Sequence, residues 1–214
     1  MHLRNSGFAP HRRQGGFIQG AILFALVIIA VVVAAFSLAN RDSQNNADSE
    51  QAKVNSTFLL KVGNDLQSGI NRAIADGANP ANIVAQVSFG PSAAVTAGTA
   101  LDLFDTNLRY VARPAFPATA LQTAGTVPTI SWATSAAITG VGDPNRNEAI
   151  MQISNIALPV CQRINNTANG TLVTATPPAA VTNAIGLTPA WREGCVGDAQ
   201  NGYSYFRAVV TDIS

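Results

Sequence analysis

The sequence predicts an α+β protein in which one long N-terminal helix packs on a C-terminal antiparallel sheet that carries a single disulfide. Two observations predict the helix: no proline lies between Pro10 and Pro80, and apolar residues recur at spacings of three and four along the second half of this stretch. A third predicts the sheet, because short β-branched or aromatic segments separated by breaker residues follow Pro80.

The first part of the predicted helix, residues 17–39, is apolar on all sides. It contains no charged residue, whereas a membrane-spanning helix needs ~20 apolar residues and a secretion signal uses an apolar core of roughly 7–15. Arginines without acidic neighbours precede this run, and residues 41–50 mix basic with acidic side chains. This asymmetry predicts a transmembrane segment with its N-terminus in the cytoplasm and the bulk of the chain outside.

Residues 40–77 are predicted to continue the same helix, polar at first and then amphipathic. Gly77 and Pro80 supply the signal that ends it. Gly63 and Gly69 disfavour the helix interior by about 1 kcal/mol each. The predicted apolar stripe consists of Val54, Phe58, Leu59, Val62, Leu66, Ile70, Ala73 and Ile74.

Residues 78–214 are predicted to form a globular α+β head. Pro159 lies in the first turn of a predicted short helix over 158–165, and an irregular loop over 166–190 follows it. Trp132, Phe206 and Tyr110 are expected to be core side chains. Strands are predicted over 107–112, 129–135, 149–154 and 203–210.

The two cysteines, Cys161 and Cys195, favour a structural disulfide if this part of the chain is exported. No further cysteine suggests a zinc site, and both histidines, His2 and His11, precede the apolar run. A disulfide that closes the 161–195 region would stabilise the fold by roughly 3–4 kcal/mol in the chain-entropy model.

The composition gives no indication of catalysis or of nucleic-acid binding. Charged residues make up 12% of the chain and the net charge is +1, so no phosphate-binding footprint is expected. A Ser/His/Asp set is excluded because both histidines precede the apolar run. Asp102 and Asp105 have the spacing of paired carboxylates, but a surface turn is the favoured interpretation. We therefore predict no enzymatic activity and no cofactor.

One segment weakly resembles a calcium loop. Asp143, Asn145 and Asn147 match the first half of an Asp-x-Asn-x-Asn loop, but Glu148 stands where such a loop needs glycine. A turn before a strand is therefore the preferred interpretation. The Asn-x-Ser/Thr triplets at Asn55, Asn165 and Asn169 are glycosylation acceptors only in a suitable host.

The N-terminal region resembles that of type IV prepilins and pseudopilins. A short basic leader, residues 1–16, ends in glycine, and Phe17 opens a hydrophobic helix that continues into an outer globular domain. The resemblance implies that a prepilin peptidase cuts between Gly16 and Phe17 and that the new N-terminus is methylated. The segments ALPVCQRINN and EGCVGDAQNGYSYFRAVV also resemble the disulfide region of type IVb pilins such as the toxin-coregulated pilin.

One residue departs from the family pattern. The family usually has glutamate at the fifth mature position, paired with a neighbour's N-terminal amine, whereas this chain has Ala21 there and Gln19 as the nearest polar group. Some minor subunits at filament tips lack this glutamate, so the departure either argues against a major-subunit role or implies a family whose packing does without it.

The expected function is that of a structural subunit of a type IV pilus-like extracellular filament. The subunit is expected to reside in the inner membrane before it assembles with itself or with other pilins. The alternatives are a minor pilin or a type II secretion pseudopilin at a filament tip, the latter in a periplasmic pseudopilus. Further alternatives are a plain single-span anchored protein and a secreted protein whose signal is removed at Ser37-Leu38-Ala39.

Overall fold

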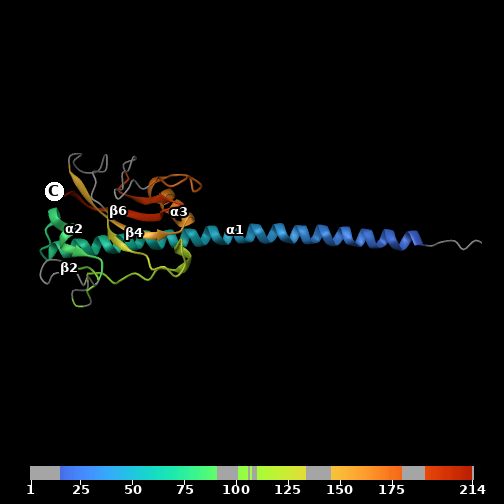
Figure 1. Cartoon of the computed structure of the whole chain (residues 1–214), viewed down its shortest axis with the longest axis horizontal. Helices are drawn as coiled ribbons and strands as arrows, with labels where there is room; N and C mark the ends of the chain where they lie inside the picture. The colour runs from blue at the N-terminus through green and yellow to red at the C-terminus, as the bar shows by residue number, and fades with distance from the viewer. Residues whose placement is uncertain are drawn as a thin grey trace, which may run out of the picture. The chain divides into compact units, whose positions relative to one another are not determined.

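The computed structural model describes residues 15–90, 101–105, 107, 110–133, 146–179 and 191–213, and their side chains except over 15–25, 34–46 and 211–213. The chain forms two compact units, Met1–Asp48 and Ser49–Ser214. Helix α1 has the bounds Gly15–Ala75 and therefore contributes residues to both units (Figure 1). The prediction of an α+β fold with one antiparallel sheet and one disulfide is confirmed.

The sheet of the Ser49–Ser214 unit has four antiparallel strands in the order β3-β4-β6-β5. The long central strands β4 and β6 are flanked by the shorter β3 and β5. The bounds are β3, Ile130–Trp132; β4, Asn147–Ile156; β5, Glu193–Asp198; and β6, Gly202–Ile213. Three of the four predicted strands therefore correspond to β3, β4 and β6.

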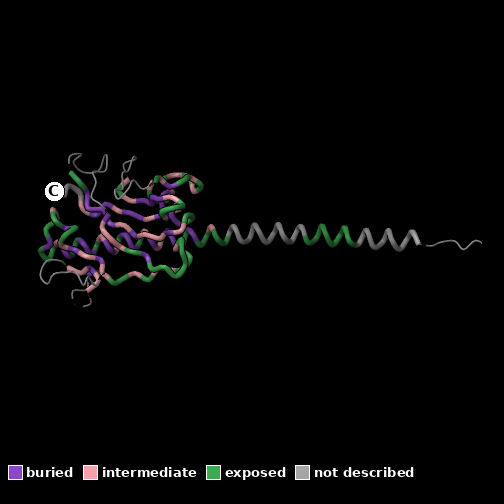
Figure 2. Tube along the Cα trace, viewed as in Figure 1, coloured by how far each residue is buried: buried purple, intermediate pink, exposed green. Residues whose placement is uncertain are grey.

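The core lies between this sheet and the part of α1 that begins at Ser49. The side chains of β4 and β6 that face α1 include Met151, Ile153 and Tyr205. The alternation expected of a strand is interrupted in β4 by irregular pairing with β6 between Ile153 and Ile156. From α1 the fully buried side chains are Leu59, Leu66, Ile70 and Ala73. Figure 2 shows buried residues concentrated along this contact.

The opposite face of the sheet is apolar as well. Ile150, Val196, Phe206 and Ala208 are buried there, and Trp191 packs against them. The sheet is thus buried on both faces at its centre, which explains why β4 is apolar at consecutive positions rather than at alternating ones.

Helix α3, Leu158–Asn169, follows β4 after one residue and lies against β5 and β6. Pro159 occupies its first turn and Gly170, with φ 69°, ends it in the left-handed conformation. The predicted helix over 158–165 is confirmed and extends four residues farther. The remaining elements are short: η1, Pro80–Asn82; α2, Ile83–Gln86; β1, Val87–Ser88; β2, Leu101–Asp102; and η2, Ala118–Ala120.

Two details of the sequence prediction were wrong. Val54 is 62% exposed, and the polar Asn55 and Ser56 are buried in its place. Asn55 donates to the Thr119 hydroxyl at 3.1 Å and Ser56 donates to the Lys53 carbonyl at 2.8 Å, so neither side chain needs water. The predicted strand over 107–112 is also absent from the described part of that segment, where Val111 and Ala112 belong to no strand.

Gly63 and Gly69, the two glycines of α1 after Ser49, mark positions where the sheet and the adjoining loop lie very close to the helix backbone. A Cβ on Gly63 would lie 1.8 Å from the Tyr205 hydroxyl oxygen, and one on Gly69 would lie 3.2 Å from Val111. Tyr205 therefore packs directly on the bare backbone of the helix at Gly63. The cost in helix propensity noted from the sequence is offset by this close packing.

Candidate functional site

The residues predicted to serve processing and assembly fall in the first turns of α1. Gly16, Phe17, Gln19 and Ala21 have helical backbone, but their side chains lie outside the described residues. Within the side chains that the structure describes, no helix combines the length and apolar content of a membrane span. Of the predicted span 17–39, that set includes residues 26–33.

The predicted calcium segment is described in part. Asp143 and Asn145 lie outside the described residues, Asn147 is exposed at the first position of β4, and Glu148 is buried beside it. Among the described ranges, no three His, Cys, Asp or Glu side chains come together as a metal site would require. Asp102 and Asp105 each accept a backbone N–H two residues ahead, from Phe104 and Asn107, as in surface turns.

The disulfide joins α3 to the edge strand β5. Cys161 and Cys195 are both fully buried and their Cα atoms are 5.2 Å apart. One helical turn beyond Cys161, the buried Asn165 contacts the same point of the strand. Its Nδ2 donates to the Cys195 carbonyl at 2.8 Å, and its Oδ1 accepts the Cys195 N–H at 2.7 Å.

The same side of β5 is bonded along most of its length. Asn169, four residues after Asn165 and therefore on the same helix face, donates to the Glu193 carbonyl at 2.8 Å. The Gly197 N–H donates to the Pro178 carbonyl at 2.8 Å. These groups are the ones that β5 turns away from β6, so α3 and the 170–179 segment close this edge against an added strand.

The asparagines of the three glycosylation triplets make hydrogen bonds within the fold. Asn55 is 1% exposed and Asn165 is 3% exposed, and both amides are hydrogen-bonded inside the fold. Asn169 is half-buried and holds the Glu193 carbonyl. These asparagines are structural in the folded head. Residues 165 and 169 lie on one helix face, and this spacing is the sequence signal from which a common partner could have been inferred.

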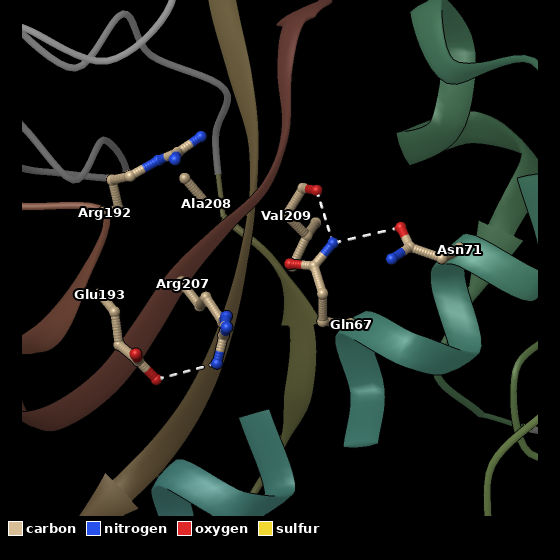
Figure 3. A pocket seen from close by; sticks show the side chains of 7 residues that line it. All are labelled: Gln67, Asn71, Arg192, Glu193, Arg207, Ala208 and Val209. Atoms are coloured by element: carbon tan, nitrogen blue, oxygen red, sulfur yellow. Dashed lines mark hydrogen bonds and ion pairs between the residues drawn. The ribbon is translucent and has the colours of Figure 1, made fainter. Parts of the chain in front are cut away.

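Beside this edge lies a polar cavity of about 320 Å³ between α1 and the strands β5 and β6. Figure 3 shows Gln67 and Asn71 on the α1 side, with the charged side chains on the strand side. Gln67 donates to the Val209 carbonyl at 2.7 Å and to the Asn71 Oδ1 at 3.4 Å. The lining residues are Gln67, Asn71, Arg192, Glu193, Arg207, Ala208 and Val209.

An ion pair forms one wall of this polar cavity. Arg207 Nη1 lies 3.2 Å from Glu193 Oε1, and both side chains are about one-fifth exposed. The hydroxyl of Tyr205 donates to the same carboxylate oxygen. Burial raises the pKa of Tyr205 far above its usual 10.0, and the adjacent Glu193 charge raises it further. The tyrosine is therefore a neutral donor over the whole physiological pH range.

A second, smaller cavity of about 180 Å³ lies along another face of α1, where apolar residues such as Phe58 and Leu66 meet the 111–114 segment. Arg113 closes one end of that segment, with its guanidinium 4.5 Å from the centre of the Phe104 ring. Its hydrogen bond to the Phe89 carbonyl, at 3.3 Å, ties the segment to the loop after β1.

Two properties of this head were missed from the sequence. Strand β5, with the sequence EGCVGD, was not among the predicted strands, and its two glycines and two acids give it little strand propensity. The polar cavity was missed because its residues are brought together from three separate segments. Comparisons of the chain with models of protein families, with curated proteins and with solved structures find no match.

Proposed function

We propose that this chain is a structural subunit of an extracellular filament of the type IV pilus class. In this proposal the N-terminal unit carries assembly, and the disulfide-linked head forms the outer surface. Chemistry is left to other proteins: a prepilin peptidase that cuts between Gly16 and Phe17, and an assembly machinery that extracts the subunit from the inner membrane.

The observation that carries the proposal is the exposed apolar surface of the N-terminal unit. The eight described side chains at 26–33 are all apolar and all exposed. Among the larger ones, the exposed fraction ranges from 46% at Val32 to 62% at Val31. A continuous apolar surface of this kind is unstable in water by about 25 cal/mol for each Å², so it requires lipid or neighbouring helices around it.

The head has properties that suit a filament surface. Its disulfide and the hydrogen bonds of Asn165 hold α3 on the edge strand, which supports a stable fold outside the cytoplasm. Because the β5 edge is closed, a filament of such subunits would be held by helix packing rather than by strands added across subunits.

The second candidate is a minor subunit or pseudopilin at a filament tip. The observation that favours it is Ala21 in place of the family's glutamate, which removes a charge pair that guides assembly. Abundance separates the two, because a major subunit dominates sheared surface fibres and a tip subunit is scarce there.

The test is mass spectrometry of the mature chain, recovered from sheared surface fibres and from the membrane of cells that express it. We expect a chain that begins at a methylated Phe17. The variant Gly16→Val should leave the leader attached and abolish recovery in fibres, whereas the matched control Gly15→Ala, which leaves the cutting residue in place, should be processed.

The other N-termini that could be found each contradict the proposal in a different way. An intact Met1 in the membrane fraction would favour a plain single-span anchor. A chain that begins at Asn40 and is found free in the medium would indicate a secreted protein with a removed signal. Processing at Phe17 without any surface filament would refute the role in an extracellular filament and would favour the pseudopilin alternative.

A further inference from the structure

The chain contains two Asn-Gly pairs, Asn169-Gly170 and Asn201-Gly202, and the structure describes both. Glycine after asparagine favours spontaneous deamidation, because glycine has no side chain to hinder attack of its nitrogen on the asparagine side-chain amide. The sequence therefore gives both pairs the same intrinsic reactivity. Their surroundings in the folded head differ, and the difference decides which of the two can react.

The Asn169-Gly170 pair is held at both of the groups that would have to react. The Gly170 N–H donates to the Asn166 carbonyl at 3.0 Å. The side-chain amide of Asn169 is half-buried and donates to the Glu193 carbonyl at 2.8 Å. The pair ends α3, which the disulfide joins to β5. The reaction at this pair therefore requires α3 to separate from β5.

The Asn201-Gly202 pair lies at the tip of the hairpin formed by β5 and β6. Asn201 is exposed in the turn, and Gly202, with φ 84°, opens β6 in the last residue pair of the two strands, opposite Asp198. The Asn201 N–H and Nδ2 donate to the Asp198 carboxylate at 2.7 and 3.0 Å. Within the described part of the chain its side chain has no other hydrogen-bond partner. Freeing this pair requires only the end of the hairpin to open, and such ends open at little cost in free energy.

We propose that Asn201 is a site of spontaneous deamidation in the folded head, whereas Asn169 is protected from the same reaction. In the first step the Gly202 nitrogen forms a bond to Asn201 Cγ, the bond between Cγ and Nδ2 breaks, and the NH₂ group leaves with the Gly202 proton as ammonia. Water from the solvent then opens the cyclic imide at either carbonyl, which gives aspartate or isoaspartate. This proposal does not depend on whether the chain assembles into a filament.

The reaction would change the tip of the hairpin. It replaces the amide that donates to Asp198 Oδ2 at 3.0 Å by a carboxylate, so a hydrogen bond gives way to repulsion between like charges. Hydrogen bonds from the Asn201 backbone and side chain lower the pKa of Asp198, so this pKa should rise after deamidation. Isoaspartate also lengthens the backbone by one carbon, which should loosen the pairing of Asp198 with Gly202.

The experiment is peptide mapping by mass spectrometry of the full chain in detergent, sampled during incubation in mildly alkaline buffer. Aspartate and isoaspartate products are separated by chromatography. In the folded chain with its disulfide intact, we expect Asn201 to convert at least about tenfold faster than Asn169, because the two sites differ in the free energy of local opening. In the chain reduced and unfolded in denaturant, both should convert at similar rates, because glycine follows each of them.

Two variants test the cause of the difference. Asn165→Ala removes the hydrogen bonds between α3 and Cys195, so it should accelerate conversion of Asn169 and leave that of Asn201 unchanged. Asn201→Gln is the control at the reactive position, and it should abolish the fast reaction because glutamine would have to form a larger ring.

The parent chain alone decides the proposal, whether or not Asn165→Ala folds. Asn201 that stays intact in the folded chain while it converts in the unfolded chain would show that the hairpin tip is protected, and the proposal would be wrong. Conversion of Asn169 as fast as that of Asn201 in the folded chain would equally overturn it, because α3 would then give no protection. A folded Asn165→Ala chain in which Asn169 reacts no faster would refute the contact between α3 and β5 as the source of the protection.

Discussion

Gly63→Ala is the substitution for which the sequence and the structure predict opposite effects. In an exposed helix, replacing glycine by alanine stabilises by about 1 kcal/mol. At Gly63 the new Cβ would lie 1.8 Å from the Tyr205 hydroxyl oxygen and 2.8 Å from Cζ of the same ring. Tyr205 is fully buried, so it has no free space into which it could move.

The size of the effect follows from two costs. Overpacking a core costs about 1–3 kcal/mol. Displacing the ring also breaks the hydrogen bond from Tyr205 to the Glu193 carboxylate, and a hydrogen bond to a charged group is worth about 1.5–3 kcal/mol. After the gain in helix propensity is subtracted, Gly63→Ala should destabilise the head by roughly 1.5–5 kcal/mol.

The assay is thermal unfolding followed by circular dichroism. For a chain of this size each kcal/mol shifts Tm by about 2–4 °C, so a fall of at least about 3 °C is expected. Gly69→Ala is the graded control, because its Cβ would meet Val111 at 3.2 Å and the contact can relax by a few tenths of an ångström. Its Tm should lie closer to that of the parent.

A double-mutant cycle with Tyr205→Phe isolates the contact. Removing the hydroxyl relieves the 1.8 Å overlap but leaves Cζ at 2.8 Å, so Gly63→Ala should cost less in a chain that already carries Tyr205→Phe, by about 0.5–3 kcal/mol. A Gly63→Ala variant as stable as the parent, or more stable, would refute the packing of Tyr205 on the bare helix backbone.

Three further predictions concern the edge strand and its surroundings. Asn165→Ala should lower the free energy of unfolding by about 2–5 kcal/mol in denaturant titrations, because it leaves the buried N–H and C=O of Cys195 unpaired; the exposed Asn71→Ala should change it little. Reduction of the disulfide, which spans a separation of 34 residues, should lower the free energy of unfolding by about 3–4 kcal/mol, and protection of the β5 amides from hydrogen exchange should fall first. Because the pKa of Tyr205 is raised in the folded state, its contribution to stability is present below pH 10 and is lost as the pH rises toward the folded-state pKa. The parent should therefore lose stability more steeply above pH 10 than the variant Tyr205→Phe. Equal slopes would contradict the burial of this hydroxyl.

The helices and the central strands could be predicted from the sequence because their determinants are local. The absence of proline up to Pro80 and the stripe through Leu59, Leu66 and Ile70 describe a helix with one buried face. Strands β4 and β6 are rich in β-branched and aromatic residues, and Pro159 and Gly170 mark the ends of α3. Each of these signals acts within a few residues of the element that it specifies.

Strand β5 and the closure of its edge by α3 and the 170–179 segment could be found only from the tertiary structure. EGCVGD has little strand propensity of its own, and it is a strand because β6 pairs with one side while Asn165, Asn169 and Pro178 bond the other. The same asparagines look like glycosylation acceptors in the sequence, since burial cannot be read from a triplet of residues.

The polar cavity and the role of Gly63 also required the tertiary structure. Gln67, Arg192 and Arg207 are far apart in the chain and become neighbours because β5 and β6 pair in one register and α1 crosses them. Gly63 costs stability when α1 is considered alone and contributes it once Tyr205 lies against it. Local propensity and periodicity thus determined the elements of this protein, and the pairing of distant segments decided which of their side chains meet.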